Sequence, residues 1–247
     1  VGWHDFVLYC INHGYAGVEN LALIPGNVGA SPMQNIGAYG VEIKDFFHSL
    51  EAIDIAENKK VVFTNSECEF GYRESVFKNI YKNQFVIIAV VYRLNKIPNY
   101  NIEYGAIREE LDKMKIDQLS IGNIAQAVMN IRRSKLPDPK IIGNAGSFFK
   151  NPEISSAEFE SLKSEFPQLV GYKNENNSVK VAAGWLIESC GWKGYRIGDA
   201  GCHEKQALVL VNFGKASGNE IFDLSEKIIE SVKNKFGILL QREVNII

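Results

Sequence analysis

The sequence predicts an α+β fold, built as one large or two medium domains. Segments typical of strands and segments typical of helices alternate along the chain without a regular β-α-β rhythm. The 247 residues, 46% of them hydrophobic, are enough to bury a sizeable core. A Leu-Pro-Asp-Pro run at 136–139 interrupts the pattern and is the best candidate for a boundary.

The first expected element is a helix over residues 4–14, and a glycine-rich stretch follows it. Apolar side chains recur at helical spacing in the first segment, and Gly14 is a candidate C-cap. Between 16 and 40 the chain carries five glycines. Such a density favours loops whose backbone comes close to something else.

Three strands are expected next, over residues 49–56, 60–64 and 85–93, because Val, Ile and Phe are enriched there. The run from Val86 to Val91 is almost wholly apolar. This pattern is typical of a strand covered on both faces.

Two helices complete the first half, one over 107–116 and one over 121–133 with Ser120 as its candidate N-cap. The proline-containing run then stops the second helix. We therefore expect a first domain at 1–134 and a second at 135–238, with a terminal strand at 239–247.

The second half begins with an expected Gly/Asn loop at 143–147. A helix over 157–166 follows, and Ser155 and Glu158 are spaced as a capping box at its start. The remaining expected elements are a helix over 182–190, a strand over 207–211, a long helix over 219–236 and a closing strand at 244–247.

Composition excludes several classes of function. A net charge of −2 gives no concentrated positive surface for nucleic acid or an anionic membrane. No apolar stretch is long enough to span a bilayer. The four cysteines and four histidines are scattered without metal-ligand spacing, so we expect no metal site and idle thiols in a reducing, cytoplasmic compartment.

Two candidate sites lie in the first half. The glycine-rich segment 24–40 has turns whose free N–H groups can face an anion, and Gln34 and Asn35 add amide groups. Taken alone, such a segment is more often a plain connection, and no GxGxxG follows a strand. Arg73 lies among aromatics and can bind a carboxylate or stack on a ring, but a surface Arg paired with Glu74 or Glu69 is the commoner case.

Two further candidates lie in the second half. Ser147 follows small residues and precedes two phenylalanines, so its hydroxyl can face a sheltered cleft, although a turn serine is the usual explanation. No GxSxG elbow supports a serine hydrolase. Glu243, near the C-terminus, proves nothing by itself.

Together these segments resemble the UDP-N-acetylenolpyruvoylglucosamine reductase family, flavoenzymes of peptidoglycan precursor synthesis. The resemblance runs from about Trp3 to the last residue. It rests on IPGNVGASPMQNIGAYG (24–40), FGYRESVFK (70–78), LPDPK followed by GNAGSFFKNP (136–152), AAGWLIESCGWKG (182–194) and REVNII (242–247).

The resemblance implies a fold and a reaction. The first domain would be the remaining part of an FAD-binding domain of the FAD-linked oxidase (PCMH-like) type, and an α+β substrate-binding domain would follow. NADPH would reduce FAD, and the flavin N5 hydride would pass to the enolpyruvyl double bond of UDP-N-acetylglucosamine enolpyruvate. Ser147 would donate the proton to the adjacent carbon, with Arg73 and Glu243 beside the substrate carboxylate.

Binding residues follow from the same resemblance. Asn101 to Gly105 looks like the tyrosine-bearing loop of one family type, so Tyr104 would fold over the substrate. The residues expected to hold the substrate are Tyr72, Tyr104, Lys135, Asn151 and Gln206. Those expected to contact the flavin are Ile24, Pro25, Gly26, Gly29, Gln34, Asn35, Gly37, Ala38 and Tyr39. The protein would act as a cytoplasmic monomer, without nucleic acid or membrane partners.

One departure from the family is expected at the N-terminus. The chain starts at Val1 without Met, and relatives carry a further segment that forms the first half of the flavin fold. We therefore expect a fragment, with a split or defective gene product as the alternative, that binds FAD weakly or not at all. Two other functions stay open: a nucleotide-sugar-binding module without activity, and an unrelated flavin oxidase. The sequence leaves open whether Glu243 acts as a protonated carboxyl or through a water.

Overall fold

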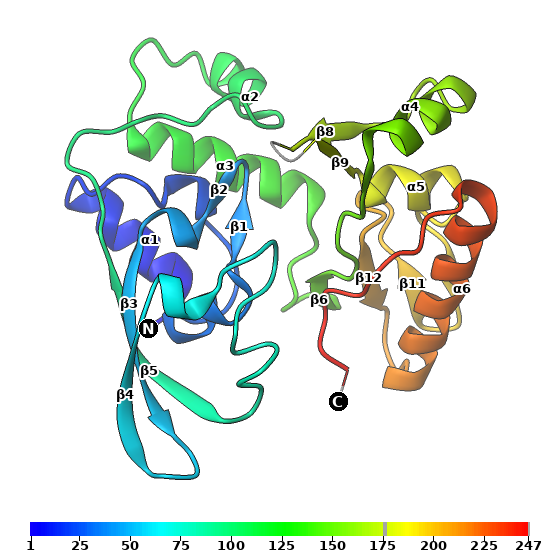
Figure 1. Cartoon of the computed structure of the whole chain (residues 1–247). Helices are drawn as coiled ribbons and strands as arrows, with labels where there is room; N and C mark the ends of the chain where they lie inside the picture. The colour runs from blue at the N-terminus through cyan, green and yellow to red at the C-terminus, as the bar shows by residue number, and fades with distance from the viewer. Residues whose placement is uncertain (175–176, 247) are drawn as a thin grey trace. The chain divides into compact units, whose positions relative to one another are not determined.

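The computed structural model describes residues 1–174 and 177–246. The chain divides into two compact units, Val1–Ser134 and Lys135–Ile247. Each unit combines helices with antiparallel sheets (Figure 1), in agreement with the predicted mixture of helices and strands.

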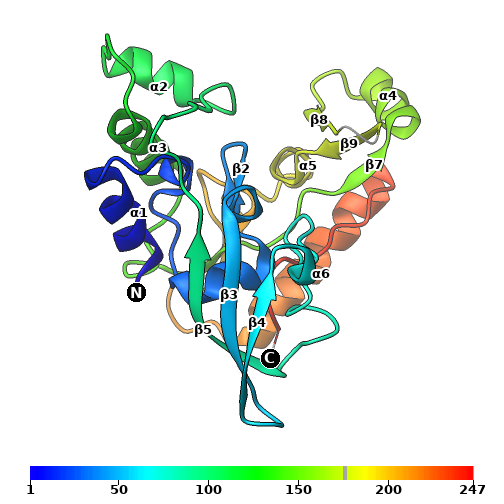
Figure 2. The same ribbon diagram turned by 60° about the vertical axis from the view of Figure 1, so that its left-hand side comes forward.

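A three-stranded antiparallel sheet forms the centre of the first unit. Its middle strand is β3 (Phe47–Asp54), flanked by β4 (Lys59–Thr64) and β5 (Phe85–Tyr92), as Figure 2 shows. Leu50 lies opposite Phe63 on one side and Val90 on the other. The three strands agree with the three expected ones to within two residues at each end.

Burial of β5 on both faces was predicted and is wrong. Val86 and Ile88 are each 53% exposed, and Val91 is 46% exposed. β5 is an edge strand of an antiparallel sheet, so one face packs against the core of its own unit while the other points away from it. The apolar run alone could not distinguish this arrangement from a central strand.

Three helices belong to the first unit: α1 (Trp3–Asn12), α2 (Ile107–Lys113) and α3 (Ile121–Lys135). Ser120 caps α3 as predicted, because its Oγ accepts a 3.1 Å hydrogen bond from the N–H of Asn123. α2 ends three residues before its predicted end, since Lys115 has a left-handed backbone with φ of 54°. Buried side chains of α1 and α3, such as Val7 and Val128, share one core with the sheet.

Short elements fill the rest of the first unit. They are η1 (Glu19–Leu21), η2 (Val28–Gln34), β1 (Gly37–Ala38), β2 (Val41–Glu42), η3 (Ile43–Asp45) and η4 (Ser66–Cys68). The glycine-rich stretch is therefore a 3-10 turn followed by a small hairpin, in which β1 pairs with β2.

The described residues of the second unit form two antiparallel sheets. The larger has the strand order β10-β11-β12-β6 and the smaller has the order β7-β9-β8. The strands are β6 (Gly143–Ser147), β7 (Glu153–Ser155), β8 (Gly171–Lys173), β9 (Ser178–Val181), β10 (Arg196–Ile197), β11 (Ala200–Cys202) and β12 (Val209–Asn212). The expected loop at 143–147 is thus wrong: ladder bonds to β12 hold Gly and Asn residues of low strand propensity in a strand.

The helices of the second unit were largely predicted. They are α4 (Ser156–Glu165), α5 (Ala183–Ser189) and α6 (Gly218–Phe236). The capping box of Ser155 and Glu158 is confirmed at α4. α6 begins with a second capping box and buries Leu224, Ile228 and Val232 against the larger sheet.

The expected closing strand is not formed within the described residues 244–246, and Ile247 lies outside them. The C-terminal segment instead makes a single bridge, between Arg242 and Phe149. The C-terminal pairing is therefore shorter than the expected strand at 244–247, and it lies earlier in the chain, at Arg242.

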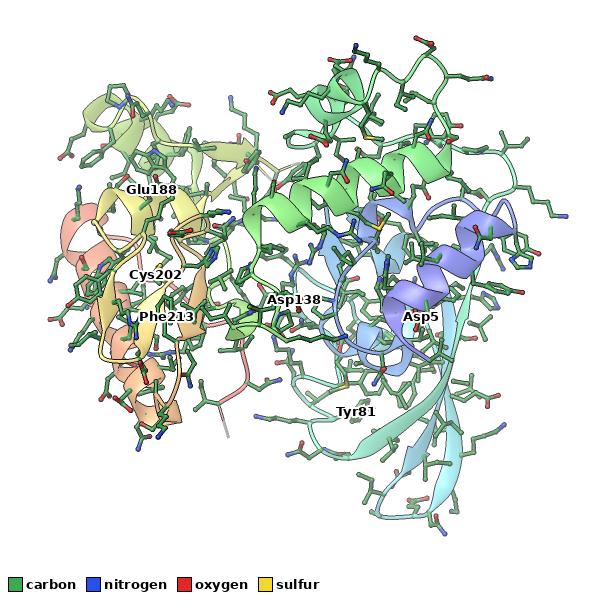
Figure 3. All side chains as sticks on the ribbon, turned by 180° about the vertical axis from the view of Figure 1, so that it is seen from behind. Asp5, Tyr81, Asp138, Glu188, Cys202 and Phe213 are labelled. Atoms are coloured by element: carbon green, nitrogen blue, oxygen red, sulfur yellow. The ribbon has the colours of Figure 1, made fainter. Side chains whose placement is uncertain are left out.

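The link after α3 is a compact turn around Asp138, which is labelled in Figure 3. Its Oδ1 accepts from the N–H of Lys140, and its carbonyl accepts from the N–H groups of Ile141 and Ile142. Among the helices of residues 1–174 and 177–246, none combines the length and the apolar character needed to cross a membrane.

Candidate functional site

The glycine-rich segment is held by contacts that explain several of its glycines. Gly26 has a φ of 108°, a conformation that favours glycine, with open space around it. A Cβ on Gly29 would lie 3.4 Å from the carbonyl oxygen of Ile87. Ile24, Pro25 and Gly26 reach the surface or lie just below it. The segment thus presents backbone, with few side chains, to any ligand that approaches it.

Arg73 is anchored to the far end of this segment. Its Nη2 donates a 2.6 Å hydrogen bond to the carbonyl of Gly37, and its Nη1 lies 4.0 Å from Oε1 of Glu42. Its guanidinium carbon lies 5.2 Å from the ring centroid of Tyr72. Arg73 also has a φ of 57°, unusual for a residue with a side chain. The guanidinium is therefore fixed in direction, with one face against an aromatic ring.

Asn35 is fully buried, and its side chain serves the protein itself. Nδ2 donates to Oε2 of Glu42 at 3.0 Å and to the carbonyl of Gly71 at 2.9 Å, while Oδ1 accepts from the N–H of Lys44. These bonds tie the glycine-rich segment to the loop that carries Arg73. We assign Asn35 the task of joining these two predicted sites.

Tyr39 contacts a cation that the sequence did not single out. Its phenol lies near the guanidinium of Arg132 of α3, whose Nε donates to the carbonyl of Leu23 at 3.3 Å. Burial raises the pKa of Tyr39 above its usual range, and burial lowers the pKa of Arg132. Arg132 is thus a largely buried cation whose named partners are neutral groups.

Tyr104 lies against the same segment. Its Cβ is 3.2 Å from the position that a Cβ on Gly40 would occupy, and Tyr104 is 38% exposed. A pocket of about 440 Å³ borders this point, lined by Gly40, Asn101 and, among others, Arg93. The tyrosine-bearing loop and the glycine-rich segment are therefore direct neighbours.

In the second unit, an irregularity of the sheet sets the position of Ser147. Ser147 pairs with Val209 and Asn144 with Val211, so Ala145 and Gly146 together face Leu210 alone. This is a β-bulge, and Gly146 carries its left-handed conformation with φ of 74°. A bulge shifts the alternation of side chains by one residue, so it determines which face of the sheet the Ser147 hydroxyl meets.

Glu243 comes back to the same place. Its N–H donates to the carbonyl of Phe148 at 2.8 Å, and the N–H of Phe148 donates to Leu208. The neighbouring Arg242 extends toward α6, where its Nε donates to Oγ of Ser225 at 2.8 Å and its guanidinium pairs with Glu226. Successive side chains of an extended segment point to opposite sides, so Glu243 leaves the chain on the side away from α6.

Two expected substrate residues meet at the start of α5. Oδ1 of Asn151 accepts a 2.9 Å hydrogen bond from the N–H of Ala183. Oε1 of Gln206 accepts from the N–H of Leu208, and it lies 3.3 Å from where a Cβ on Gly184 would be. Lys135, at the end of α3, is exposed.

The structure therefore joins the predicted residues into two groups. Within the first unit, Gly37 contacts Arg73. Gly40, next to Tyr39 in the chain, packs against Tyr104, and Gly105, next to Tyr104, packs against the ring of Tyr39. Within the second unit, Ser147 and Glu243 belong to adjacent segments. The meeting of Arg73 with this second pair stays a prediction.

Sequence reasoning missed Arg132 and Asn20. Asn20 is 1% exposed and donates to two backbone carbonyls in the first unit. No local signal marks either residue, because Asn20 follows Glu19 and Arg132 is followed directly by Arg133. Among the described residues, no group of three His, Cys, Asp or Glu side chains is placed to hold a metal ion.

Comparison with known proteins identifies the family. Residues 138–247 match the family model described as UDP-N-acetylenolpyruvoylglucosamine reductase, C-terminal domain. The chain is 52% identical over 246 residues to UDP-N-acetylenolpyruvoylglucosamine reductase of Flavobacterium johnsoniae, covering 99% of this chain and 73% of that protein. It is 50% identical to the enzyme of the same name from Pseudomonas savastanoi pv. phaseolicola, covering 99% of this chain and 72% of that protein.

A solved structure agrees with this result at the level of the fold. The crystal structure of UDP-N-acetylenolpyruvylglucosamine reductase from Thermus caldophilus superposes with a TM-score of 0.67 at 22% identity, over 99% of this chain and 69% of that one. This chain covers more than two thirds of both curated relatives, and about half of the aligned residues are identical. The chain therefore belongs to the UDP-N-acetylenolpyruvoylglucosamine reductase family of oxidoreductases.

Proposed function

We propose that this protein reduces the enolpyruvyl group of UDP-N-acetylglucosamine enolpyruvate to give UDP-N-acetylmuramate, with NADPH as hydride donor and FAD as carrier. The reaction would serve peptidoglycan precursor synthesis in the cytoplasm, with the protein acting as a monomer. Family membership supports this reaction. The observation that carries it is the pair of Ser147 and Glu243, brought to neighbouring segments at a β-bulge.

Ser147 acts as the proton donor in this proposal. Hydride addition to the terminal carbon of the double bond leaves negative charge on the adjacent carbon, as an enolate of the carboxylate. This adjacent carbon is a strong base. A serine hydroxyl is a weak acid in water, so it needs a fixed geometry and a strongly basic acceptor to transfer its proton. The bulge at Gly146 supplies a fixed direction for that hydroxyl.

Arg73 and Glu243 act at the carboxylate end of the substrate. A guanidinium fixed by Gly37 and packed near Tyr72 can stabilise the negative charge that develops during hydride addition more than it stabilises the substrate itself. Glu243 orients the same end, either as a protonated carboxyl or through a water.

The first unit, Val1–Ser134, is assigned to FAD binding. The residues in contact with the flavin would be Ile24, Pro25, Gly26, Gly29, Gln34, Gly37, Ala38 and Tyr39. Asn35, which was also expected there, is fully buried with both ends of its amide bonded within the protein, so it would hold the segment without touching the ligand. A test of fit is Arg132, a largely buried cation whose named partners, Tyr39 and Leu23, are neutral. A cation near Tyr39 fits an electron-accepting ring, because positive charge beside the ring would favour its taking up electrons. When bound, FAD supplies the hydride to the substrate.

The second unit is assigned to the sugar nucleotide, with residues 135–238 as the substrate domain and 239–247 as the segment that brings Glu243 to the site. Lys135 supplies positive charge for the diphosphate, and Asn151 and Gln206 supply amide groups. The amide nitrogen of Asn151 is the group that faces the ligand, since its Oδ1 is occupied by Ala183. Tyr72 and Tyr104 complete the binding set from the first unit.

The experiment is a two-stage assay of the purified protein supplied with FAD. NADPH is added first and the loss of the visible flavin absorbance is followed; UDP-N-acetylglucosamine enolpyruvate is then added anaerobically and the return of absorbance is followed. Reoxidation with formation of UDP-N-acetylmuramate supports the proposal. Binding of the sugar nucleotide without turnover would instead identify a binding module. In a separate aerobic run, reoxidation by oxygen faster than that of free reduced FAD, with no response to the enolpyruvyl substrate, would identify an oxidase.

A further inference from the structure

Asn20 connects two loops that are far apart along the chain. It is 1% exposed, and its Nδ2 donates to the carbonyl of Tyr39 at 3.0 Å and to the carbonyl of Asn101 at 2.8 Å. A side-chain amide carries two N–H donors on one nitrogen, and here each donor satisfies one carbonyl. One buried side chain therefore holds the glycine-rich segment and the tyrosine-bearing loop to the same point.

The contact between the loops is close on both sides of Asn20. Nδ2 of Asn101 donates to the carbonyl of Gly40 at 3.0 Å. A Cβ on Gly40 would lie 3.2 Å from Cβ of Tyr104, and a Cβ on Gly105 would lie 3.7 Å from the ring of Tyr39. The position of Tyr104 is therefore built directly against Tyr39 and Gly40.

No other common side chain of this size can replace Asn20. Asp is nearly identical in shape but accepts only, so its carboxylate would face two carbonyl oxygens. Leu has no donor and would leave both carbonyls without this partner. The amide is thus required for a bonding reason, and its effect is on the two loops that it joins.

We propose that Asn20 is a positioning residue that couples the Tyr104 loop, residues 101–105, to the glycine-rich segment at Tyr39 and Gly40. The closing of Tyr104 on the sugar nucleotide then depends on how that segment is seated. This inference rests on the proposed function, in which Tyr104 binds substrate and Tyr39 contacts the flavin. It adds the residue through which the two sites communicate.

A double-mutant cycle on the protein supplied with excess FAD tests the coupling. Asn20→Asp and Tyr104→Ala are each expected to raise KM for UDP-N-acetylglucosamine enolpyruvate about tenfold, while the rate of flavin reduction by NADPH changes less than about twofold. The double variant is expected to be no worse than the poorer single variant, because both act through one loop. Multiplication of the two effects in the double variant would overturn the proposal.

A second readout does not depend on activity. Lys96 and Arg108 flank the Tyr104 loop and are exposed, whereas Lys59 and Lys60 are exposed residues at the start of β4, just after the distant β3–β4 turn. Asn20→Asp is expected to accelerate tryptic cleavage at Lys96 and Arg108 at least about fivefold and to leave cleavage at the β3–β4 turn unchanged. Equal acceleration at all four sites would mean a general loss of stability and would contradict the assignment.

Two further variants complete the design. Asn99→Asp places the same charge on an exposed residue of the neighbouring chain segment and should match wild type in both readouts. Asn101→Ala removes the bond to Gly40 from the opposite side, and it should reproduce the proteolysis result even if Asn20→Asp does not fold. If wild type reduces no enolpyruvyl substrate, the proposed function fails, while the proteolysis still decides whether Asn20 holds the loop.

Discussion

Nη1 of Arg73 lies 3.1 Å from the position that a Cβ on Gly37 would occupy, while Nη2 of the same guanidinium donates to the Gly37 carbonyl. The carbonyl oxygen of Val41 is 2.9 Å from that Cβ position. The glycine and the arginine therefore form one unit of packing, in which the missing side chain of one makes room for the other.

Gly37→Ala should displace Arg73 and lower both stability and activity. Overpacking of this kind costs about 1–3 kcal/mol, and the shifted guanidinium should reduce kcat/KM for the enolpyruvyl substrate. Thermal unfolding and steady-state kinetics measure the two effects. Gly218→Ala is the control, since Gly218 lies in α6 with open space around it. Unchanged kinetics in Gly37→Ala would argue against a role for Arg73 at the substrate.

Ser147→Ala should separate the two half-reactions. Flavin reduction by NADPH should stay close to wild type, because the hydroxyl takes no part in it. Reoxidation by the enolpyruvyl substrate should slow by about 10²-fold or more, the scale of a lost general acid. Stopped-flow absorbance measures both steps, and equal slowing of both would remove Ser147 from its assigned role.

Gly146→Ala should disturb the direction of the Ser147 hydroxyl. A left-handed backbone costs a residue with a side chain about 1–2 kcal/mol, so stability should fall by that amount. The matched control is Gly191→Ala, since Gly191 has a similar φ of 81° and equally open surroundings. Both variants should unfold at similarly reduced temperatures, but only Gly146→Ala should slow reoxidation. A similar loss of activity in the two variants would mean that the bulge has no specific role in the reaction.

The capping box of α6 should make stability depend on pH in the acid range. Hydrogen bonds from the N–H and Oγ of Ser217 lower the pKa of Glu220 below its ordinary value of 4.5. A depressed carboxyl pKa stabilises the fold above the ordinary value, and this stabilisation is lost as the pH falls through the folded-state pKa. The difference in unfolding temperature between wild type and Ser217→Ala should therefore be larger at neutral pH than at about pH 3. A difference independent of pH would mean that the carboxylate contributes nothing.

The sequence predicted the long elements well because their signals are local. α6 has a capping box, a glycine at its C-terminus and apolar residues at helical spacing, all within one segment. The strands of the first unit are likewise marked by β-branched residues. β6 was missed because its Gly and Asn residues become a strand only through pairing with β12, a segment far along the chain whose position the local sequence does not reveal.

The candidate site shows the same division. Ser147, Arg73 and Glu243 were chosen by resemblance to a family, and no local pattern near them predicts chemistry. Asn20 and Arg132 escaped notice because their importance lies in contacts with Tyr39, which are set by the tertiary fold. Both residues stand beside charged residues in the sequence, and their partners are known only when distant segments are brought together.

The outward face of β5 has a consequence for how the chain behaves before it is fully folded. Val86 and Ile88 belong to an edge strand with an uninterrupted apolar run, a type of segment that readily pairs with a strand of another molecule. On the same face of the sheet, Glu51 of β3 and Lys60 of β4 form a 3.1 Å ion pair. These charges act as gatekeepers, because stacking a second sheet on this face would strip their water, and intramolecular folding thereby competes better with self-association.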